Sequence, residues 1–276
     1  MDTLVESDRV AARLDNQERQ SGAKTVNEES ALRIVDVRDA WEYDGIGHLP
    51  HAVNVPFDSF RSEDAGETGM LPGADAFSSL LSEVGIEATD RIVAYDDMHG
   101  VFAARFLVTC ELYGHPRDRL HLLNGDYSAW SRQHPVSNDT PDTTPTEYEG
   151  SFVETGPLVG LETVEQAMDD PDAVLIDTRE RSEFEAGHIP GAVRLDWMDL
   201  VDETGRGVQP ETEIRSTLRT RDITPDRSVV LYCNTARRIS HTYTVLRHLG
   251  YEQLAFYEGS LTEWKREGGP LATGSE

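Results

Sequence analysis

Lysine is almost absent from this sequence, since only Lys24 and Lys265 occur among its 25 basic residues. With 51 acidic residues, the formal net charge is −26. An acidic surface argues against nucleic-acid partners and against anionic membranes, because both need a basic face. Acid excess with so little lysine is typical of cytosolic proteins of extreme halophiles, where the Debye length falls to about 3 Å at 1 M salt. An ordinary acidic protein is the alternative.

Long apolar runs are also missing, because no segment approaches the roughly 20 residues that a membrane span needs. The first residues, MDTLVESDRV, lack the basic start and apolar core of a secretion signal, so we expect a cytoplasmic protein without a membrane partner. Cysteine is scarce, with only Cys110 and Cys233, which makes a disulfide framework implausible. The length of 276 residues suits two ordinary domains.

The sequence contains an internal repeat. The segment IVDVRDAWEYDGIGHLPHAVNVPF, from Ile34, matches LIDTRERSEFEAGHIPGAVRLDW, from Leu175. Further blocks downstream match in the same order, so the chain is read as two copies of one domain. The main matched pairs are Asp36 and Asp177, Arg38 and Arg179, Glu42 and Glu183, His48 and His188, and Trp130 and Trp264.

A segment rich in proline, threonine and acids, HPVSNDTPDTTPTEYEGS, separates the copies and is typical of a linker. We expect a first domain over residues 1–145, a linker over 146–157 and a second domain over 158–276. Apolar runs at 33–37, 92–95, 173–176 and 229–232 suit buried parallel strands. Residues 101–113 and 239–249 suit crossover helices. The predicted class is therefore α/β, with two tandem domains that each have a parallel sheet flanked by helices.

Cys233 follows a predicted strand directly and precedes a short polar loop and a helix. Ligands of open α/β sheets bind beyond the carboxyl ends of the strands, where loop N–H groups and a helix N-terminus favour anions. A cysteine at this position is expected to have a lowered pKa and to be largely thiolate. Arg237 and Arg238 add fixed positive charge that could dock an oxyanion. An inert core cysteine is the alternative, but it does not explain two adjacent arginines.

The D-x-R…GHIPGA motif, followed by strand, cysteine, loop and helix, resembles the rhodanese family in its tandem form of thiosulfate and 3-mercaptopyruvate sulfurtransferases. The resemblance covers almost the whole chain, and the loop CNTARRIS is similar to the thiosulfate-type pattern C-R-x-G-x-R-[ST]. It implies that Cys233 carries a persulfide and that the substrate is bound by Arg238, Arg237, Asn234, Thr235 and Ala236. Asn234 and Ala236 stand where arginine and glycine are usual, which leaves the sulfur donor open.

The first copy has no cysteine at the matching position, where either Asp96 or Asp97 stands. Neither carboxylate can hold a sulfane sulfur, and the resemblance implies a catalytically silent first domain. Two adjacent carboxylates are a weak metal signal, so we expect a solvated loop and no metal. Cys110 lies in an apolar helical stretch and is expected to pack in the core.

The predicted function is thiosulfate sulfurtransferase activity, which passes sulfane sulfur from thiosulfate to cyanide or a thiol through a Cys233 persulfide. The partners are then a small-molecule donor and a thiophilic acceptor, with no cofactor, in a monomer or a dimer. A 3-mercaptopyruvate sulfurtransferase and a sulfur-relay protein are the alternatives. A cysteine-dependent phosphatase fits less well, because its C-x5-R loop is one residue longer than the spacing from Cys233 to Arg238.

Overall fold

The structure is a computed structural model that describes residues 1–21, 31–62, 70–234 and 236–275. The described residues form two units. The first consists of the described parts of Met1–Ser62 and Leu71–Val153, together with Glu203–Gly207. The second contains residues 154–202 and 208–275. Each unit holds one of the two sequence repeats.

The first unit is built around a parallel sheet. Its strands are β1 (Leu4–Glu6), β2 (Leu32–Asp36), β3 (Ala52–Asn54), β4 (Arg91–Tyr95) and β5 (Leu120–Asn124). Its α-helices are α1 (Ser7–Ser21), α2 (Ala40–Ile46), α3 (Ala74–Glu83), α4 (Val101–Leu112) and α5 (Tyr127–Trp130), and its 3-10 turns are η1 (Phe57–Phe60) and η2 (Arg117–Arg119).

The second unit repeats this plan. Its sheet strands are β6 (Leu158–Val159), β7 (Ala173–Asp177), β8 (Val193–Arg194), β11 (Ser228–Tyr232) and β12 (Leu254–Tyr257), and β9 (Val201–Asp202) pairs with β10 (Gly207–Val208) as a separate ribbon. Its helices are α6 (Leu161–Asp169), α7 (Arg181–Ala186), η3 (Trp197–Leu200), α8 (Glu211–Thr220), α9 (Arg237–His248) and α10 (Ser260–Arg266).

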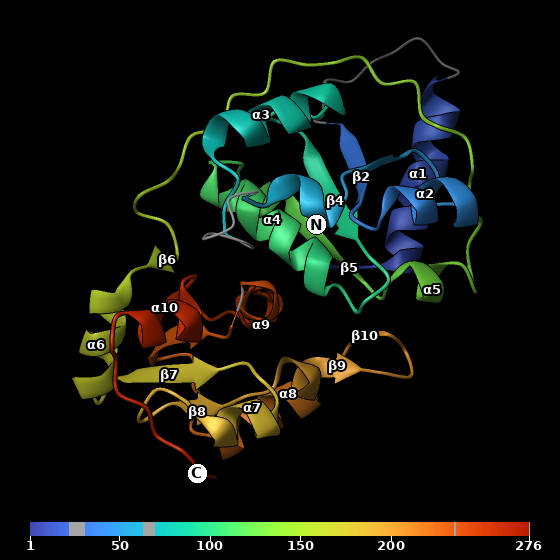
Figure 1. Ribbon diagram of the computed structural model, residues 1–276. Helices are drawn as coiled ribbons and strands as arrows, with labels where there is room; N and C mark the ends of the chain where they lie inside the picture. The colour runs from blue at the N-terminus through green and yellow to red at the C-terminus, as the bar shows by residue number, and fades with distance from the viewer. Residues whose placement is uncertain (22–30, 63–69, 235, 276) are drawn as a thin grey trace. The chain divides into compact units, whose positions relative to one another are not determined.

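The two sheets have the same strand order among the described residues. The first runs β1-β5-β4-β2-β3 and the second β6-β12-β11-β7-β8, and all the paired strands within them are parallel. Helices lie on both faces of each sheet (Figure 1). The strands and crossover helices predicted from apolar runs are confirmed within a residue or two at their ends, and so is the α/β class. Each repeat is a complete α/β domain.

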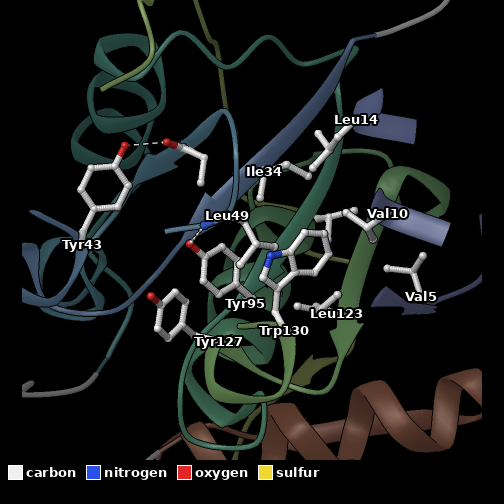
Figure 2. Close-up of a cluster of buried hydrophobic side chains, with 12 residues drawn as sticks. Val5, Val10, Leu14, Ile34, Tyr43, Leu49, Tyr95, Leu123, Tyr127 and Trp130 are labelled. Atoms are coloured by element: carbon white, nitrogen blue, oxygen red, sulfur yellow. Dashed lines mark hydrogen bonds between the residues drawn. The ribbon is translucent and has the colours of Figure 1, made fainter. Parts of the chain in front are cut away.

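A cluster of buried side chains covers one face of the first sheet, where α1, α2 and α5 pack (Figure 2). Trp130 of α5 belongs to this cluster and is 1% exposed, and its indole N–H donates to the carbonyl of Pro135 over 2.9 Å. The second unit repeats this arrangement, because Trp264 of α10 is equally buried and donates to the carbonyl of Pro270 over 2.8 Å. Both tryptophans anchor the helix that follows the last sheet strand of their unit.

A buried ion pair lies at the carboxyl end of β2 in the first unit. The Arg38 guanidinium donates to both carboxylate oxygens of Asp36, with a shortest distance of 2.6 Å, and also to the carbonyl of Gly47. Asp177 and Arg179 make the same contacts after β7, including a bond to the carbonyl of Gly187. Each pair therefore joins a strand end to the turn that follows the next helix.

The segment that sequence composition favours as a linker is bonded to the first unit over part of its length. Thr146 donates its hydroxyl to the carbonyl of Ile86 over 2.6 Å, and the N–H of Val153 donates to the carbonyl of Leu112 over 2.9 Å. Tyr148 is only 4% exposed and lies beside His115. The second unit begins at Glu154 and contains residues 154–202 and, after Glu203–Gly207, the described residues from Val208 onward. The linker range of 146–157 stays a prediction.

Breaking the buried pair in the first unit should be costly. We expect Arg38→Met to lower the free energy of unfolding by about 3–5 kcal/mol, because Asp36 then keeps a buried charge without its counter-ion. Urea denaturation followed by tryptophan fluorescence measures this. The control is Arg9→Met, which removes an exposed pair with Asp2 and should change the free energy by less than about 1 kcal/mol. Equal losses in the two variants would contradict the structural role of the buried pair.

Candidate active site

Cys233 is the first residue after β11, and its backbone is held on both sides. Its N–H donates to the Ser260 hydroxyl over 3.1 Å, and its carbonyl accepts from the N–H of Leu261 over 3.0 Å. The preceding carbonyl, of Tyr232, accepts from the N–H and hydroxyl of Thr178. The cysteine is thus held by the start of α10 and by the residue that follows β7. Its side chain is buried.

A hydrogen-bonded network surrounds the loop after Cys233. The amide of Asn234 donates to one carboxylate oxygen of Glu183, and the Arg238 guanidinium donates to the other. On its other side, the Asn234 side-chain oxygen accepts from Arg179 over 3.4 Å. Glu183 lies on α7 and Arg238 on α9, so the network joins the buried Asp177–Arg179 pair to the start of the helix that follows the cysteine.

The remaining predicted loop residues fall on the same turn of chain. Ala236 is 2% exposed and precedes α9 directly, and Arg237 is the half-buried first residue of that helix. Thr235 lies outside the described residues. The structure therefore brings Cys233, Asn234, Ala236 and the two arginines onto one strand-loop-helix segment.

The positive charge at this site is compensated by carboxylates. Glu183 pairs with Arg238, and their side chains are 23% and 30% exposed. The Asp196 carboxylate also interacts with the positive charge of Arg238. Burial raises the pKa of this carboxyl, whereas the charges of Arg194 and Arg238 lower it. The positive charge that Arg238 brings to this site is thus balanced by neighbouring carboxylates.

Strand register identifies the residue of the first unit that corresponds to Cys233. Tyr95 ends β4 opposite Asp36, as Tyr232 ends β11 opposite Asp177. The carbonyl of Asp96 accepts from the N–H of Tyr127 over 2.8 Å, which mirrors the bond from Leu261 to Cys233. Of the two candidates that the sequence leaves open, the matching residue is Asp96.

The Asp96 carboxylate lies in a cradle of backbone N–H groups. It accepts four such bonds, from Met98, Gly100, Phe102 and Ala103, at 2.7–3.0 Å. Gly100 makes this turn with φ of 83°, in the left-handed region that glycine adopts readily. Burial raises the pKa of Asp96 and the four N–H groups oppose that rise, since they favour the charged form. The loop after the fourth strand of this repeat therefore binds an anion that the chain itself supplies.

The side chains expected to be structural are buried and bonded locally. Cys110 is fully buried on α4, and burial raises the pKa of its thiol well above the ordinary value. His48 and His188 bond backbone carbonyls of their own turns, those of Leu49 and Phe184. No group of three His, Cys, Asp or Glu side chains that could hold a metal occurs among the described residues. In the same part of the chain, every helix is too short or too polar to cross a membrane.

Sequence comparisons match this chain to sulfur-transferring proteins. The family described as "Rhodanese-like domain" matches residues 18–133 and again residues 161–267. The thiosulfate sulfurtransferase of Azotobacter vinelandii is 30% identical over 242 residues, which cover 84% of this chain and 88% of that protein. The thiosulfate sulfurtransferase of Corynebacterium glutamicum is 31% identical, with 84% and 82% covered. The sulfur carrier protein TtuD of Thermus thermophilus is 28% identical, with 90% and 93% covered.

Solved structures share the fold of the whole chain. The wild-type structure of EanB superposes with a TM-score of 0.81 at 19% identity and covers 99% of this chain and 70% of its own. The crystal structure of YnjE gives a TM-score of 0.82 at 20% identity, with 99% and 69% covered.

Two α/β repeats, of which the second places a cysteine at the end of a central strand, define a tandem-domain sulfurtransferase. The chain belongs to the rhodanese-like domain family, and each repeat matches that family separately.

Sequence reasoning missed two residues of this site. The repeat identifies Glu183 only as the match of Glu42. In the structure its carboxylate accepts hydrogen bonds from both Asn234 and Arg238. Its position six residues after Asp177, on the first turns of a helix at the same sheet edge, was the available signal. Ser260, which bonds the Cys233 N–H, has φ of 52° in a tight turn. No pattern in the sequence distinguished it from other serines.

Removing the built-in anion of the first repeat should destabilise it. We expect Asp96→Asn to lower the free energy of unfolding by about 3 kcal/mol, since buried N–H donors lose a charged acceptor. Urea denaturation of the full chain measures the change. Asp75→Asn on the exposed first turn of α3 is the control and should shift the free energy by less than about 0.5 kcal/mol. A loss no larger than that of the control would mean that the cradle does not depend on its carboxylate.

Proposed function

We propose that this chain is a thiosulfate sulfurtransferase in which Cys233 carries the transferred sulfur. The observation that carries the proposal is the place of Cys233, directly after β11 and before Asn234, with Arg238 on the first turn of α9. The first repeat supports it, because the equivalent loop points four N–H groups at an anionic side chain. A loop of this kind at Cys233 would favour a thiolate and, after reaction, a persulfide anion.

The first half-reaction is attack of the Cys233 thiolate on the outer sulfur of thiosulfate. A bond forms between the two sulfurs, the bond from that sulfur to the sulfonate breaks, and sulfite leaves with the electron pair. Arg238 and the loop N–H groups would stabilise the charge that develops on the leaving sulfite. Arg237, Asn234, Thr235 and Ala236 would complete the set of substrate-binding residues.

The second half-reaction returns the enzyme to its starting state. An acceptor nucleophile, cyanide or a thiolate, attacks the outer persulfide sulfur and displaces the Cys233 thiolate. With cyanide the product is thiocyanate. No metal or organic cofactor takes part in either step. The burial of Cys233 would keep water away from the persulfide between the two steps.

The first repeat is proposed to carry no sulfur, because Asp96 stands where Cys233 stands in the second. A carboxylate cannot form a persulfide. The domain limits of 1–145 and 158–276 belong to the same proposal. The oligomeric state in this proposal is a monomer or a dimer.

We propose that the protein works in the cytoplasm of a salt-accumulating cell. A net charge of −26 with only two lysines supports this proposal. Mutual repulsion of the acidic side chains would destabilise the folded state at low ionic strength and would be screened at high ionic strength.

Replacing the nucleophile tests the function directly. We expect Cys233→Ser to lower thiosulfate-dependent thiocyanate formation by at least about a thousand-fold, because the nucleophile is lost. Mass spectrometry of the wild type after thiosulfate treatment should show one added sulfur atom on the peptide that contains Cys233.

The matched control is Cys110→Ser, which removes the other buried thiol, on α4, and should leave both readouts unchanged. Iodoacetamide tests access to the thiol. Both side chains are buried in the structure, but Cys233 lies at a strand end and Cys110 within α4, so we expect Cys233 to be labelled much faster than Cys110. A Cys233 that remains unlabelled and gains no sulfur would rule out the proposed nucleophile.

Salt should stabilise this protein through screening. We expect the thermal unfolding midpoint to rise when potassium chloride increases from about 0.1 M to about 1 M, since the Debye length falls from about 10 Å to about 3 Å. Circular dichroism melts measure the midpoint. Glycerol at matched osmolality is the control, because it leaves the charges unscreened. Equal stability at both salt concentrations would count against a salt-adapted protein.

A further inference from the structure

One carboxylate holds the active-site loop at two points. Glu183 accepts from the Asn234 amide, one residue after Cys233, and from the Arg238 guanidinium, at the start of α9. Its side chain is 23% exposed, and that of Arg238 is 30% exposed, so neither group is sealed from solvent. The arginine proposed to bind the anionic donor is therefore already paired with a carboxylate.

We infer that Glu183 is a positioning residue that also sets the affinity of the site for its anionic donor, an inference that rests on the proposed function. Its carboxylate keeps Asn234 and Arg238 in place around the cysteine loop. The same carboxylate competes with the doubly negative thiosulfate for the Arg238 guanidinium. Donor binding then requires Arg238 to exchange one anionic partner for another, and Glu183 weakens binding while it orders the loop.

The two roles depend on different properties of the side chain. Positioning needs hydrogen-bond acceptors at both oxygens, whereas competition with the donor needs the negative charge. Glutamine loses the charge but keeps one acceptor oxygen, and so one of the two anchors, whereas alanine loses the charge and both anchors. Asp196 remains as a second carboxylate in the field of Arg238 in either variant, so the guanidinium is not left without any counter-charge.

The first repeat provides a matched control. Glu42 occupies the corresponding position on α2 and is also half-buried, but its carboxylate accepts the N–H of Asp39 in the capping box of its own helix. Glu42→Gln therefore makes the same chemical change at the matching position of a repeat that has no cysteine loop.

The experiment is steady-state kinetics of thiosulfate with cyanide as acceptor, on the full chain and on Glu183→Gln, Glu183→Ala and Glu42→Gln. In Glu183→Gln we expect the KM for thiosulfate to fall about two- to five-fold, the range expected for a partly exposed ion pair. In Glu183→Ala we expect kcat to fall at least about ten-fold, and further than in Glu183→Gln, because the loop loses both anchors. Glu42→Gln should match the wild type.

A binding measurement that does not need turnover accompanies the kinetics. Sulfate cannot donate sulfur, and its protection of Cys233 from iodoacetamide reports occupancy of the anion site. The half-protecting sulfate concentration should fall about two- to five-fold in Glu183→Gln relative to wild type. A purely structural role would instead raise both this concentration and KM.

The outcomes separate the two proposals. If the wild type transfers sulfur and Glu183→Gln shows an unchanged or raised KM and half-protecting concentration, the inference on Glu183 is wrong and the proposed function stands. If the wild type transfers no sulfur and gains none on Cys233, the proposed function fails and the inference falls with it.

Discussion

Backbone N–H groups that converge on an anion after a central strand are the feature on which this protein depends. In the first repeat they bind the Asp96 carboxylate, which is buried and accepts four such bonds. A peptide N–H carries its partial charge without a side chain, so the binding survives changes of sequence in the loop. The same strand-loop-helix turn can therefore hold a carboxylate in one copy and present a sulfur in the other.

The buried aspartate-arginine pairs fix where this turn lies. Asp177 ends the strand next to β11, and Arg179 bonds both Asp177 and the carbonyl of Gly187. Arg179 also reaches Asn234, one residue after the cysteine. Removing one partner of a buried ion pair lowers the free energy of unfolding by several kcal/mol. The pair is therefore a suitable base for a loop that must keep its geometry. In the second repeat, Glu183 extends this base to Arg238.

The two repeats carry different charges at this turn. Asp96 and Asp97 stand after β4, where Cys233 and Asn234 stand after β11. In a chain of net charge −26, the proposed anionic donor would be repelled by the acidic surface wherever salt does not screen it, so its binding would rely on local donors such as Arg238. The pairing of Arg238 with Glu183 makes that local balance adjustable by one carboxylate.

The sequence by itself determined the duplication, the α/β class and the strand-end cysteine, because apolar runs and ordered motifs are local and repeat along the chain. It also placed Arg237 and Arg238 beside Cys233, since neighbours in sequence stay neighbours in the fold. Only the tertiary structure decided that Asp96, and not Asp97, corresponds to Cys233, because strand register settles a one-residue ambiguity. It alone placed Glu183 and Ser260 at the site and showed the cysteine to be buried, because these contacts join residues that are far apart in the sequence.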